Sequence, residues 1–156
     1  MNKHLSKNEQ ILDLGTPNEL SIFLQNKGYD INSCHGFDFD LEHEKINNYD
    51  YDTFVAFEVF EHLVSPFPIL RDIKAKKLVI TVPLRLWFAK AYRNQNDPYD
   101  QHYHEFESWQ LDMLIEKAGW KIIAREKWTP PFQFNGIRSI LRAFTPRFYA
   151  VYAKRE

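Results

Sequence analysis

Two acidic residues and a histidine stand close together in the segment Glu58-Val59-Phe60-Glu61-His62. Within a helical turn the three polar side chains can converge on one side, because residues three or four apart are neighbours there. Two carboxylates and an imidazole can hold a divalent cation or remove the proton of a phenolic oxygen. The acids also suit a helix start, where they complement the helix dipole while the histidine packs on a sheet. For the metal we favour this packing interpretation, and His62 is our best candidate for a base or a substrate contact.

A second polar group lies in the long connection formed by residues 84–104, where aromatic and cationic side chains are interspersed. Such a loop could form a lid that receives a planar or anionic substrate through stacking and charge pairing. It could equally do no more than cover the edge of a small sheet, and both interpretations stay open. His104, at the end of the connection, is our second catalytic candidate. The side chains concerned are Arg85, Trp87, Phe88, Tyr92, Arg93, Tyr99, His102, Tyr103 and His104.

The elements that must position these residues are short apolar runs that alternate with helical patterns. This alternation predicts an α/β fold with a parallel sheet and helices on both faces. We expect strands at residues 10–14, within 29–40, and at 51–57, 77–83, 120–124 and 148–153. The buried, β-branched runs at 51–57 and 77–83 should be central neighbours.

Three helices can be placed from their end signals and apolar spacing. The first should begin at Thr16-Pro17-Asn18-Glu19, with Thr16 as the cap, Pro17 in the first turn and Glu19 completing a capping box. Another should span residues 108–118, with Ser108 as its cap, and end at Gly119. A short amphipathic helix should follow the turn at Asn135-Gly136, with Ile137, Ile140, Leu141 and Phe144 aligned.

The bulk composition fits one domain over residues 1–156, since 44% of the residues are hydrophobic and can form a core. No apolar run approaches the roughly 20 residues of a membrane span, and the polar start has no signal-peptide core, so we expect a cytoplasmic protein. A single cysteine, Cys34, excludes an intramolecular disulfide. The five cations between Arg138 and Arg155 are more typical of a solvated face than of a nucleic-acid site.

The order of several motifs resembles the class I S-adenosylmethionine-dependent methyltransferases over most of the chain. The motifs are Ile11-Leu12-Asp13-Leu14-Gly15, the strand at 52–55 leading into Glu58-Val59-Phe60-Glu61-His62, Val79-Ile80-Thr81-Val82-Pro83, and His104-Glu105-Phe106 before Gly119-Trp120. The resemblance implies a Rossmann-like, doubly wound, mostly parallel sheet with an antiparallel last strand. It also implies a cofactor, S-adenosylmethionine, bound across the carboxyl ends of the strands, where open α/β sheets bind ligands. The Glu-x-x-Glu-His pattern itself resembles that of ubiquinone-type O-methyltransferases, in which these residues are associated with a divalent ion.

The same resemblance assigns cofactor-binding roles to individual residues. Asp13 would lie near the cationic groups of the cofactor, and Gly15 and Thr16 would follow in the loop after the first strand. Asp38, with Asp40 as second choice, would accept hydrogen bonds from the ribose hydroxyls. The remaining members of the set are Phe57 and Glu58, at the end of the strand over residues 51–57.

Two departures from the family pattern bear on function. Pro17 and Glu19 stand where the family has its second and third glycines, and proline can neither adopt positive φ nor donate an N–H. Only 13 residues separate Asp38 from Asp52, which is too few for the helix and strand that the family inserts there, so one edge of the sheet should be shortened.

We therefore expect methyl transfer from S-adenosylmethionine to a small-molecule acceptor. The alternative is a catalytically inactive, methyltransferase-like binding or partner protein that has lost its cofactor. A nucleic-acid modifier is the weakest of the three hypotheses, because only the basic tail and the aromatic loop favour it.

Overall fold

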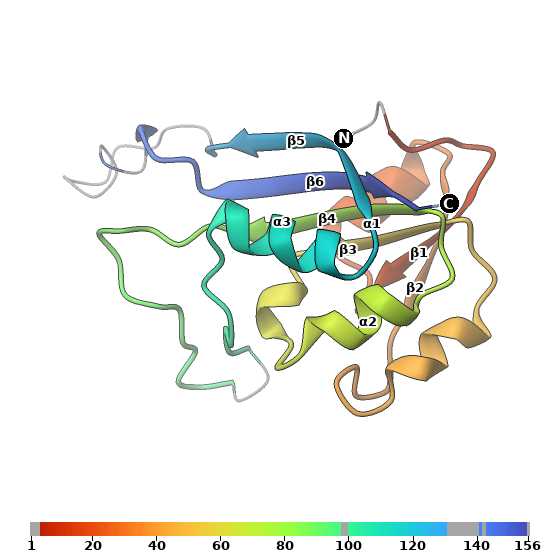
Figure 1. Ribbon diagram of the computed structural model, residues 1–156, viewed down its shortest axis with the longest axis horizontal. Helices are drawn as coiled ribbons and strands as arrows, with labels where there is room; N and C mark the ends of the chain where they lie inside the picture. Colours follow the sequence, from red (N-terminus) through yellow and green to blue (C-terminus); the bar gives the residue numbers. More distant parts are fainter. Residues whose placement is uncertain (1–3, 98–99, 131–140, 142, 156) are drawn as a thin grey trace.

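The computed structural model describes residues 4–97, 100–130, 141 and 143–155 (Figure 1). Six strands of this described chain form one sheet in the order β2-β1-β3-β4-β6-β5. Neighbours from β2 to β4 are parallel, whereas β6 is antiparallel to both β4 and β5. The strands are β1 Gln10–Leu14, β2 Asp30–Cys34, β3 Thr53–Phe57, β4 Lys77–Pro83, β5 Lys121–Trp128 and β6 Phe148–Lys154. The predicted fold class, with its antiparallel last strand, is confirmed.

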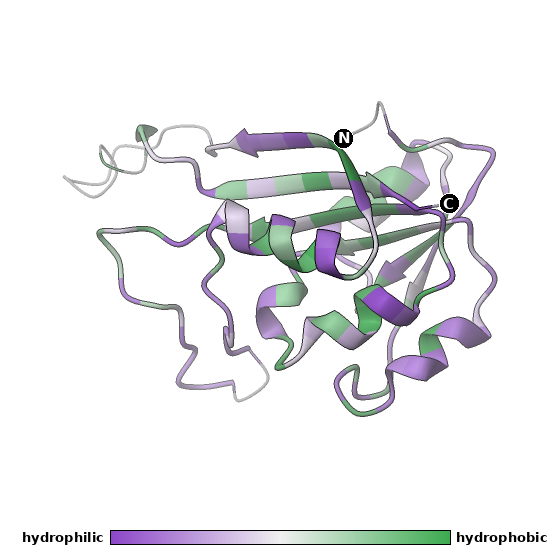
Figure 2. Cartoon of the chain, in the orientation of Figure 1, coloured by the Kyte–Doolittle hydropathy of each residue, from purple (hydrophilic) through white to green (hydrophobic). Residues whose placement is uncertain are grey.

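The centre of the sheet is the parallel pair β3 and β4, as the two β-branched runs predicted. Their register joins Thr53 to Lys77 and Phe57 to Thr81. Every residue of β3 is buried, because the strand has a neighbour on each side and is covered on both faces. Figure 2 shows this contrast clearly, since the central strands are mostly hydrophobic and the edge strand β5 is mostly hydrophilic.

Two hydrophobic clusters lie on opposite faces of the sheet. On one face α2 (Pro66–Asp72), α3 (Ser108–Lys117) and the short 3-10 helix η1 (His43–Asn48) pack over Leu12, Leu14 and their neighbours. On the other face α1 (Glu19–Asn26) contributes Leu24 to a smaller cluster with Ile11 and Ile31. None of the helices in the described part of the chain is both long and apolar enough to span a bilayer.

The sheet ends at β2, which confirms the shortened edge. Only η1 lies between β2 and β3 in the described chain, so the connection adds no further strand there. The predicted second strand within residues 29–40 is limited to Asp30–Cys34, because Gly36 turns the backbone with φ 91°. The strand expected at 120–124 runs on to Trp128, since β6 pairs with it over that whole length.

The start of α1 differs from the prediction by two residues. Asn18, not Thr16, is the cap: its side chain accepts hydrogen bonds from the backbone N–H groups of Leu20 and Ser21, both at 3.0 Å. Ser21, not Glu19, completes the capping box, because its hydroxyl accepts the Asn18 N–H at 2.8 Å. Pro17 therefore precedes the helix. Asn and Ser satisfy the free N–H groups as well as Thr and Glu would, so the sequence offers two equivalent starts.

Two further helix predictions have different outcomes. The helix after the long connection is confirmed as α3, although its cap is Glu107 and not Ser108, and Gly119 follows its end with φ 90°. The predicted helix with Ile137, Ile140, Leu141 and Phe144 falls mostly on residues 131–140 and 142, outside the described part of the chain.

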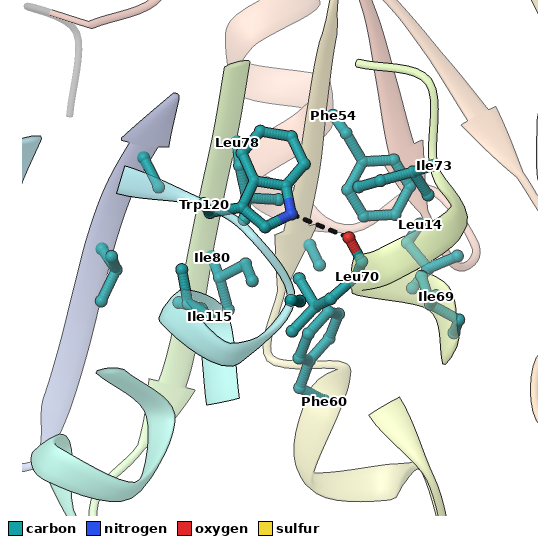
Figure 3. Close-up of a cluster of buried hydrophobic side chains, with 14 of the residues drawn as sticks. Leu14, Phe54, Phe60, Ile69, Leu70, Ile73, Leu78, Ile80, Ile115 and Trp120 are labelled. Atoms are coloured by element: carbon teal, nitrogen blue, oxygen red, sulfur yellow. Dashed lines mark hydrogen bonds between the residues drawn. The ribbon is translucent and has the colours of Figure 1, made fainter. Parts of the chain in front are cut away.

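One buried side chain links α2 to the turn between α3 and β5. The Trp120 indole N–H donates to the Leu70 carbonyl at 2.8 Å (Figure 3). Leu70 lies in the last turn of α2, where carbonyl groups have no partner within the helix. Trp120 is only 3% exposed, so this bond satisfies a carbonyl that water cannot reach and fixes α2 relative to the turn between α3 and β5.

We predict that Trp120→Phe lowers the free energy of unfolding by about 1–3 kcal/mol, because the Leu70 carbonyl stays buried without a donor. Urea unfolding of the purified variant measures the change. Trp109→Phe is the matched control, since Trp109 is 57% exposed and should change stability by less than about 0.5 kcal/mol. Equal losses in the two variants would contradict the assigned role of the indole N–H.

Candidate functional site

Buried polar atoms without a hydrogen-bond partner gather at one edge of the sheet. In the described chain they are both carboxylate oxygens of Asp13, the Ser33 hydroxyl, Oε1 of Glu58 and Oε2 of Glu61. Asp13 and Ser33 lie near the carboxyl ends of β1 and β2, and the two glutamates follow β3. Buried polar groups are normally satisfied, so this concentration is typical of a binding site.

Asp13 is fully buried and faces the α1 side of the sheet. It lies beside Ser33 and Val55 in the strand register, and Leu12 and Leu14 on either side of it point into the opposite cluster. Burial raises the pKa of Asp13 to about 7, and the nearby Ser21 hydroxyl acts against this shift. A carboxyl group in this state gains its charge readily when a cation lies against it.

The loop after β1 keeps the one glycine that its backbone requires. Gly15 has φ 105°, and its N–H donates to the Cys34 carbonyl at 2.9 Å. A Cβ placed at Gly15 would lie 3.5 Å from Val59 Cγ2, so the positive φ and not crowding demands glycine. Thr16 and Pro17 are exposed, and the first turn of α1 is capped from within the chain.

The two aspartates predicted for the ribose are held by backbone groups. Asp38 Oδ1 accepts from the N–H groups of Asp40 and Leu41 at 2.9 and 3.2 Å, as in an Asx turn. The Asp40 carboxylate accepts from Val64 and Ser65 at 3.0 and 2.8 Å, next to the start of α2. The structure thus explains Asp38 as turn-forming and Asp40 as a link between its loop and the residues before α2, and a ribose contact by Asp38 stays a prediction.

The chain turns sharply where β3 ends. Phe57 is buried on the α1 side, and Glu58 has φ 56°, a conformation that is strained for a residue other than glycine. Its N–H donates to the Thr81 carbonyl at 3.0 Å, which holds the turn against β4. Burial raises the pKa of Glu58, and Thr81 and Arg147 act against this shift.

Beyond this turn the structure brings together Glu61, His62 and His102. One ligand atom of each residue lies within 4.8 Å of the others, a spacing that a single cation could bridge. His62 Nε2 lies 3.9 Å from Glu61 Oε1, and the two imidazole rings meet edge to face at 4.8 Å. Glu61 is 1% exposed, and burial, with the nearby Glu58 and Glu105, raises its pKa to about 8.

This cluster overlaps the predicted metal set only in part. Glu61 and His62 belong to both sets, whereas Glu58 belongs only to the predicted set. His102 is the third member of the cluster. Sequence reasoning had placed His102 in the candidate lid without linking it to Glu61. The histidines are 40 residues apart, and only the shared abundance of polar and aromatic side chains around them pointed to a common site.

His102 reaches the cluster because the end of the long connection docks on the 3-10 helix η2 (Phe60–His62). The N–H groups of Tyr103 and His104 both donate to the Glu61 carbonyl, at 2.7 and 3.2 Å. In Figure 1 the connection leaves the carboxyl end of β4 and returns into α3. At its base Arg85 N–H donates to the Phe106 carbonyl at 2.8 Å, which closes the loop.

His104 lies apart from this cluster. Its Nε2 is 3.2 Å from the Val64 carbonyl, and its ring stacks on Phe106 at 5.3 Å. It lines a mostly apolar groove of about 630 Å³ between α2 and α3. The groove walls include Val64, Phe67, Tyr103, Glu105, Met113 and Leu114. A catalytic role of His104 therefore stays a prediction, and the structure relates this residue to the groove.

The buried acid Asp13 predicts an unusual dependence of stability on pH. Its pKa is about 7 in the folded chain and 3.8 as the ordinary value, so the folded state binds the proton more tightly, and stability falls as pH rises from 3.8 to about 7 and then levels off. Asp13→Asn should remove this loss and raise the free energy of unfolding at pH 8 by about 2 kcal/mol relative to the native chain. Urea unfolding of ligand-free protein between pH 5 and pH 8 measures both curves.

Asp30→Asn is the control for this experiment, because Asp30 is exposed at the other end of the adjacent strand β2. Its curve should follow that of the native chain. If the Asp13→Asn curve also runs parallel to the native one, Asp13 is not the group responsible. Some pH dependence should persist in every variant, since the pKa of Glu61 is raised in the same direction.

Comparison with known proteins identifies the fold. No family model matches the sequence, and no curated protein matches it. A methyltransferase from Mesorhizobium loti, described as S-adenosylmethionine-dependent, is similar in structure with a TM-score of 0.64 and 12% identity, over 99% of this chain and 95% of that one. A similarly described methyltransferase from Archaeoglobus fulgidus has a TM-score of 0.53 and 19% identity, over 96% of this chain and 87% of that one.

The cyclase SpnF is also similar, with a TM-score of 0.62 and 12% identity over 97% of this chain and 76% of that one. The chain thus has the fold of the class I S-adenosylmethionine-dependent methyltransferases. Since a cyclase shares this fold, the chemistry has to be argued from the site.

Proposed function

We propose that this protein is an S-adenosylmethionine-dependent methyltransferase that acts on an oxygen atom of a small-molecule acceptor. The observation that carries the proposal is the Asp13 carboxylate, which is fully buried at the carboxyl end of β1. In the described chain neither oxygen has a hydrogen-bond partner of normal geometry, since the nearby Ser21 hydroxyl donates to the Asn18 carbonyl. A buried acid without a partner destabilises the fold, so its presence at the ligand-binding edge of an α/β sheet favours a bound cation.

The residues at this edge fit the proposed cofactor. Asp13 supplies a negative charge for a ligand that carries sulfonium and ammonium groups, and the free Ser33 hydroxyl on the next strand adds a polar contact. Gly15 forms the turn after β1 with φ 105° and adds no side chain to the loop. When bound, S-adenosylmethionine supplies a methyl group that an oxygen nucleophile can attack in line.

The cluster of Glu61, His62 and His102 fits a divalent cation. One carboxylate and two imidazoles are ligands that Mn²⁺, Fe²⁺ and Zn²⁺ accept, and burial of Glu61 makes an unpaired charge there unfavourable. A cation held here would polarise the acceptor oxygen and lower its pKa. In this proposal His62 is a ligand and not the general base that the sequence suggested.

The chain itself would position the acceptor. The docked connection places the Tyr92 ring 4.5 Å from the His102 ring, and the Tyr103 N–H donates to the Glu61 carbonyl at 2.7 Å. The groove beside His104 and Tyr103 has a volume within the range of small-molecule sites and a mostly apolar lining. We therefore assign the groove to the apolar part of the acceptor and the cluster to its reacting oxygen.

The test of the cofactor is isothermal titration with S-adenosylmethionine and with its demethylated product. We expect dissociation constants of about 1–1000 µM at pH 8. Affinity should be about tenfold weaker at pH 6, because Asp13, with its pKa of about 7, is then mostly protonated and only its ionised form receives the cation. The Asp13→Asn variant should lose both its affinity for S-adenosylmethionine and the pH dependence of that affinity. If the native protein gives no heat of binding at millimolar ligand, the proposed cofactor is wrong.

The second candidate is an inactive protein that keeps the fold and no longer binds the cofactor. The self-capped start of α1 favours it, because Asn18 already occupies the N–H groups of Leu20 and Ser21. Replacing Pro17 and Glu19 by glycine distinguishes the two: a large gain of affinity for S-adenosylmethionine would show that these residues close a site that otherwise persists. Unchanged, measurable affinity in both forms would reject the inactive candidate.

If the proposed cation site is correct, metal binding should depend on His102, which lies far in sequence from the Glu-x-x-Glu-His segment. The native protein should bind Mn²⁺, and His102→Ala should weaken binding more than tenfold, since a ligand is lost. His104→Ala is the matched control, because His104 is two residues away but contacts the Val64 carbonyl. Equal affinities of the two variants, measured by titration calorimetry, would contradict the proposed ligand set.

A further inference from the structure

The connection that supplies His102 also supplies a carboxylate directly against it. Glu105 Oε1 lies 3.5 Å from His102 Nδ1. The same oxygen accepts the Tyr92 N–H at 2.7 Å, so the carboxylate is fixed by the other limb of the connection. Both partners are largely covered, with side-chain exposures of 14% for His102 and 29% for Glu105.

The His102 ring is confined on two further sides. The Tyr92 ring lies 4.5 Å from it at 44°, and the His62 ring meets it edge to face at 87°. Packing alone restricts the plane of the imidazole but does not decide which nitrogen carries the proton. That choice belongs to the acceptor opposite Nδ1, which here is Glu105.

His62 shows the same arrangement with a different acceptor. Its Nδ1 lies 3.0 Å from the Gln101 carbonyl, and the Asp100 carboxylate is more distant at 3.9 Å. Asp100 is occupied elsewhere, because its Oδ2 accepts from the Tyr92 hydroxyl and the Asn94 amide. Both imidazoles of the cluster thus turn Nδ1 towards an oxygen acceptor of the connection, which leaves both Nε2 atoms available.

We infer that Glu105 is a positioning residue, which holds His102 in the Nδ1–H form and thereby presents Nε2 as a ligand beside Glu61 and His62. The inference rests on the proposed cation site. Metal-binding histidines generally donate their second N–H to a carboxylate or a carbonyl, and loss of that partner weakens metal binding by about 10–100-fold. Glu105 is not itself a member of the group of three that lies within 4.8 Å.

The first experiment needs no metal. Two-dimensional ¹H–¹⁵N NMR of the imidazole nitrogens reports the tautomer of neutral His102 in the native chain and in Glu105→Gln. We expect the Nδ1–H form in the native protein and a mixture in the variant, whose amide also offers N–H donors. A native His102 that is mainly in the Nε2–H form would overturn the inference.

The second experiment measures Mn²⁺ affinity and the visible spectrum of the Co²⁺ form. Glu105→Gln should weaken Mn²⁺ binding about 10–100-fold and leave the Co²⁺ bands in place, since the ligand set is kept. The control is Glu107→Gln, the same change at an exposed residue that pairs with Arg85 at 3.5 Å, and its affinity should equal that of the native protein. Unchanged affinity in Glu105→Gln, or shifted Co²⁺ bands, would overturn the positioning role.

The two experiments separate this inference from the proposed function. If the native protein shows the Nδ1–H form but binds no Mn²⁺, the cation site fails and the orientation of His102 stands. If Mn²⁺ binds but His102 has the other tautomer, the site stands and Glu105 has no positioning role. If the unfolding temperature of metal-free Glu105→Gln lies within about 3 °C of that of the native chain, the loss of Mn²⁺ affinity is a local effect and not a result of unfolding.

Discussion

The candidate site depends on one junction, the Glu61 carbonyl that accepts hydrogen bonds from both Tyr103 and His104. These bonds fix the end of a connection of about twenty residues to the turn after β3. Together with the contact between His62 Nδ1 and the Gln101 carbonyl, they set the position of His102 and Glu105 relative to His62. Only backbone atoms form the junction, so it fixes where the side chains lie without restricting which residues occupy these positions. The chemistry of the site can therefore change while the path of the chain stays the same.

Buried acidic side chains lower the stability of the fold near the carboxyl ends of the parallel strands. Burial raises the pKa values of Asp13, Glu58 and Glu61, which means that each carboxylate is less favourable in the folded chain than in water. The rest of the sheet must offset this, and the fully buried strand β3 together with the two apolar clusters supplies the burial that does so. A fold that concentrates buried carboxyl groups at its proposed binding site gives up some stability there.

The sequence predicted the sheet better than the site. Strands such as β4 can be predicted because a continuous β-branched run rarely forms any other element. The shortened edge follows from the small number of residues between Asp38 and Asp52. The predicted start of α1 was wrong because two neighbouring sets of residues can cap the helix equally well. Only the backbone angles decide between them. The sequence did not link His102 to the cluster with Glu61 and His62 because His62 is 40 residues away in the chain. Local propensity carries no information about which loop will dock on which turn.

The order of the strands also sets the order in which the protein can fold. β6, the last strand that the structure describes, lies between β4 and β5, and it is antiparallel to both. During synthesis β4 therefore keeps an open edge, and β5 has no neighbour at all, until residues Phe148–Lys154 have been made. The sheet closes from its final segment, so a ribosome that stalls shortly before that point would hold a chain with an exposed apolar strand, the kind of intermediate that chaperones recognise.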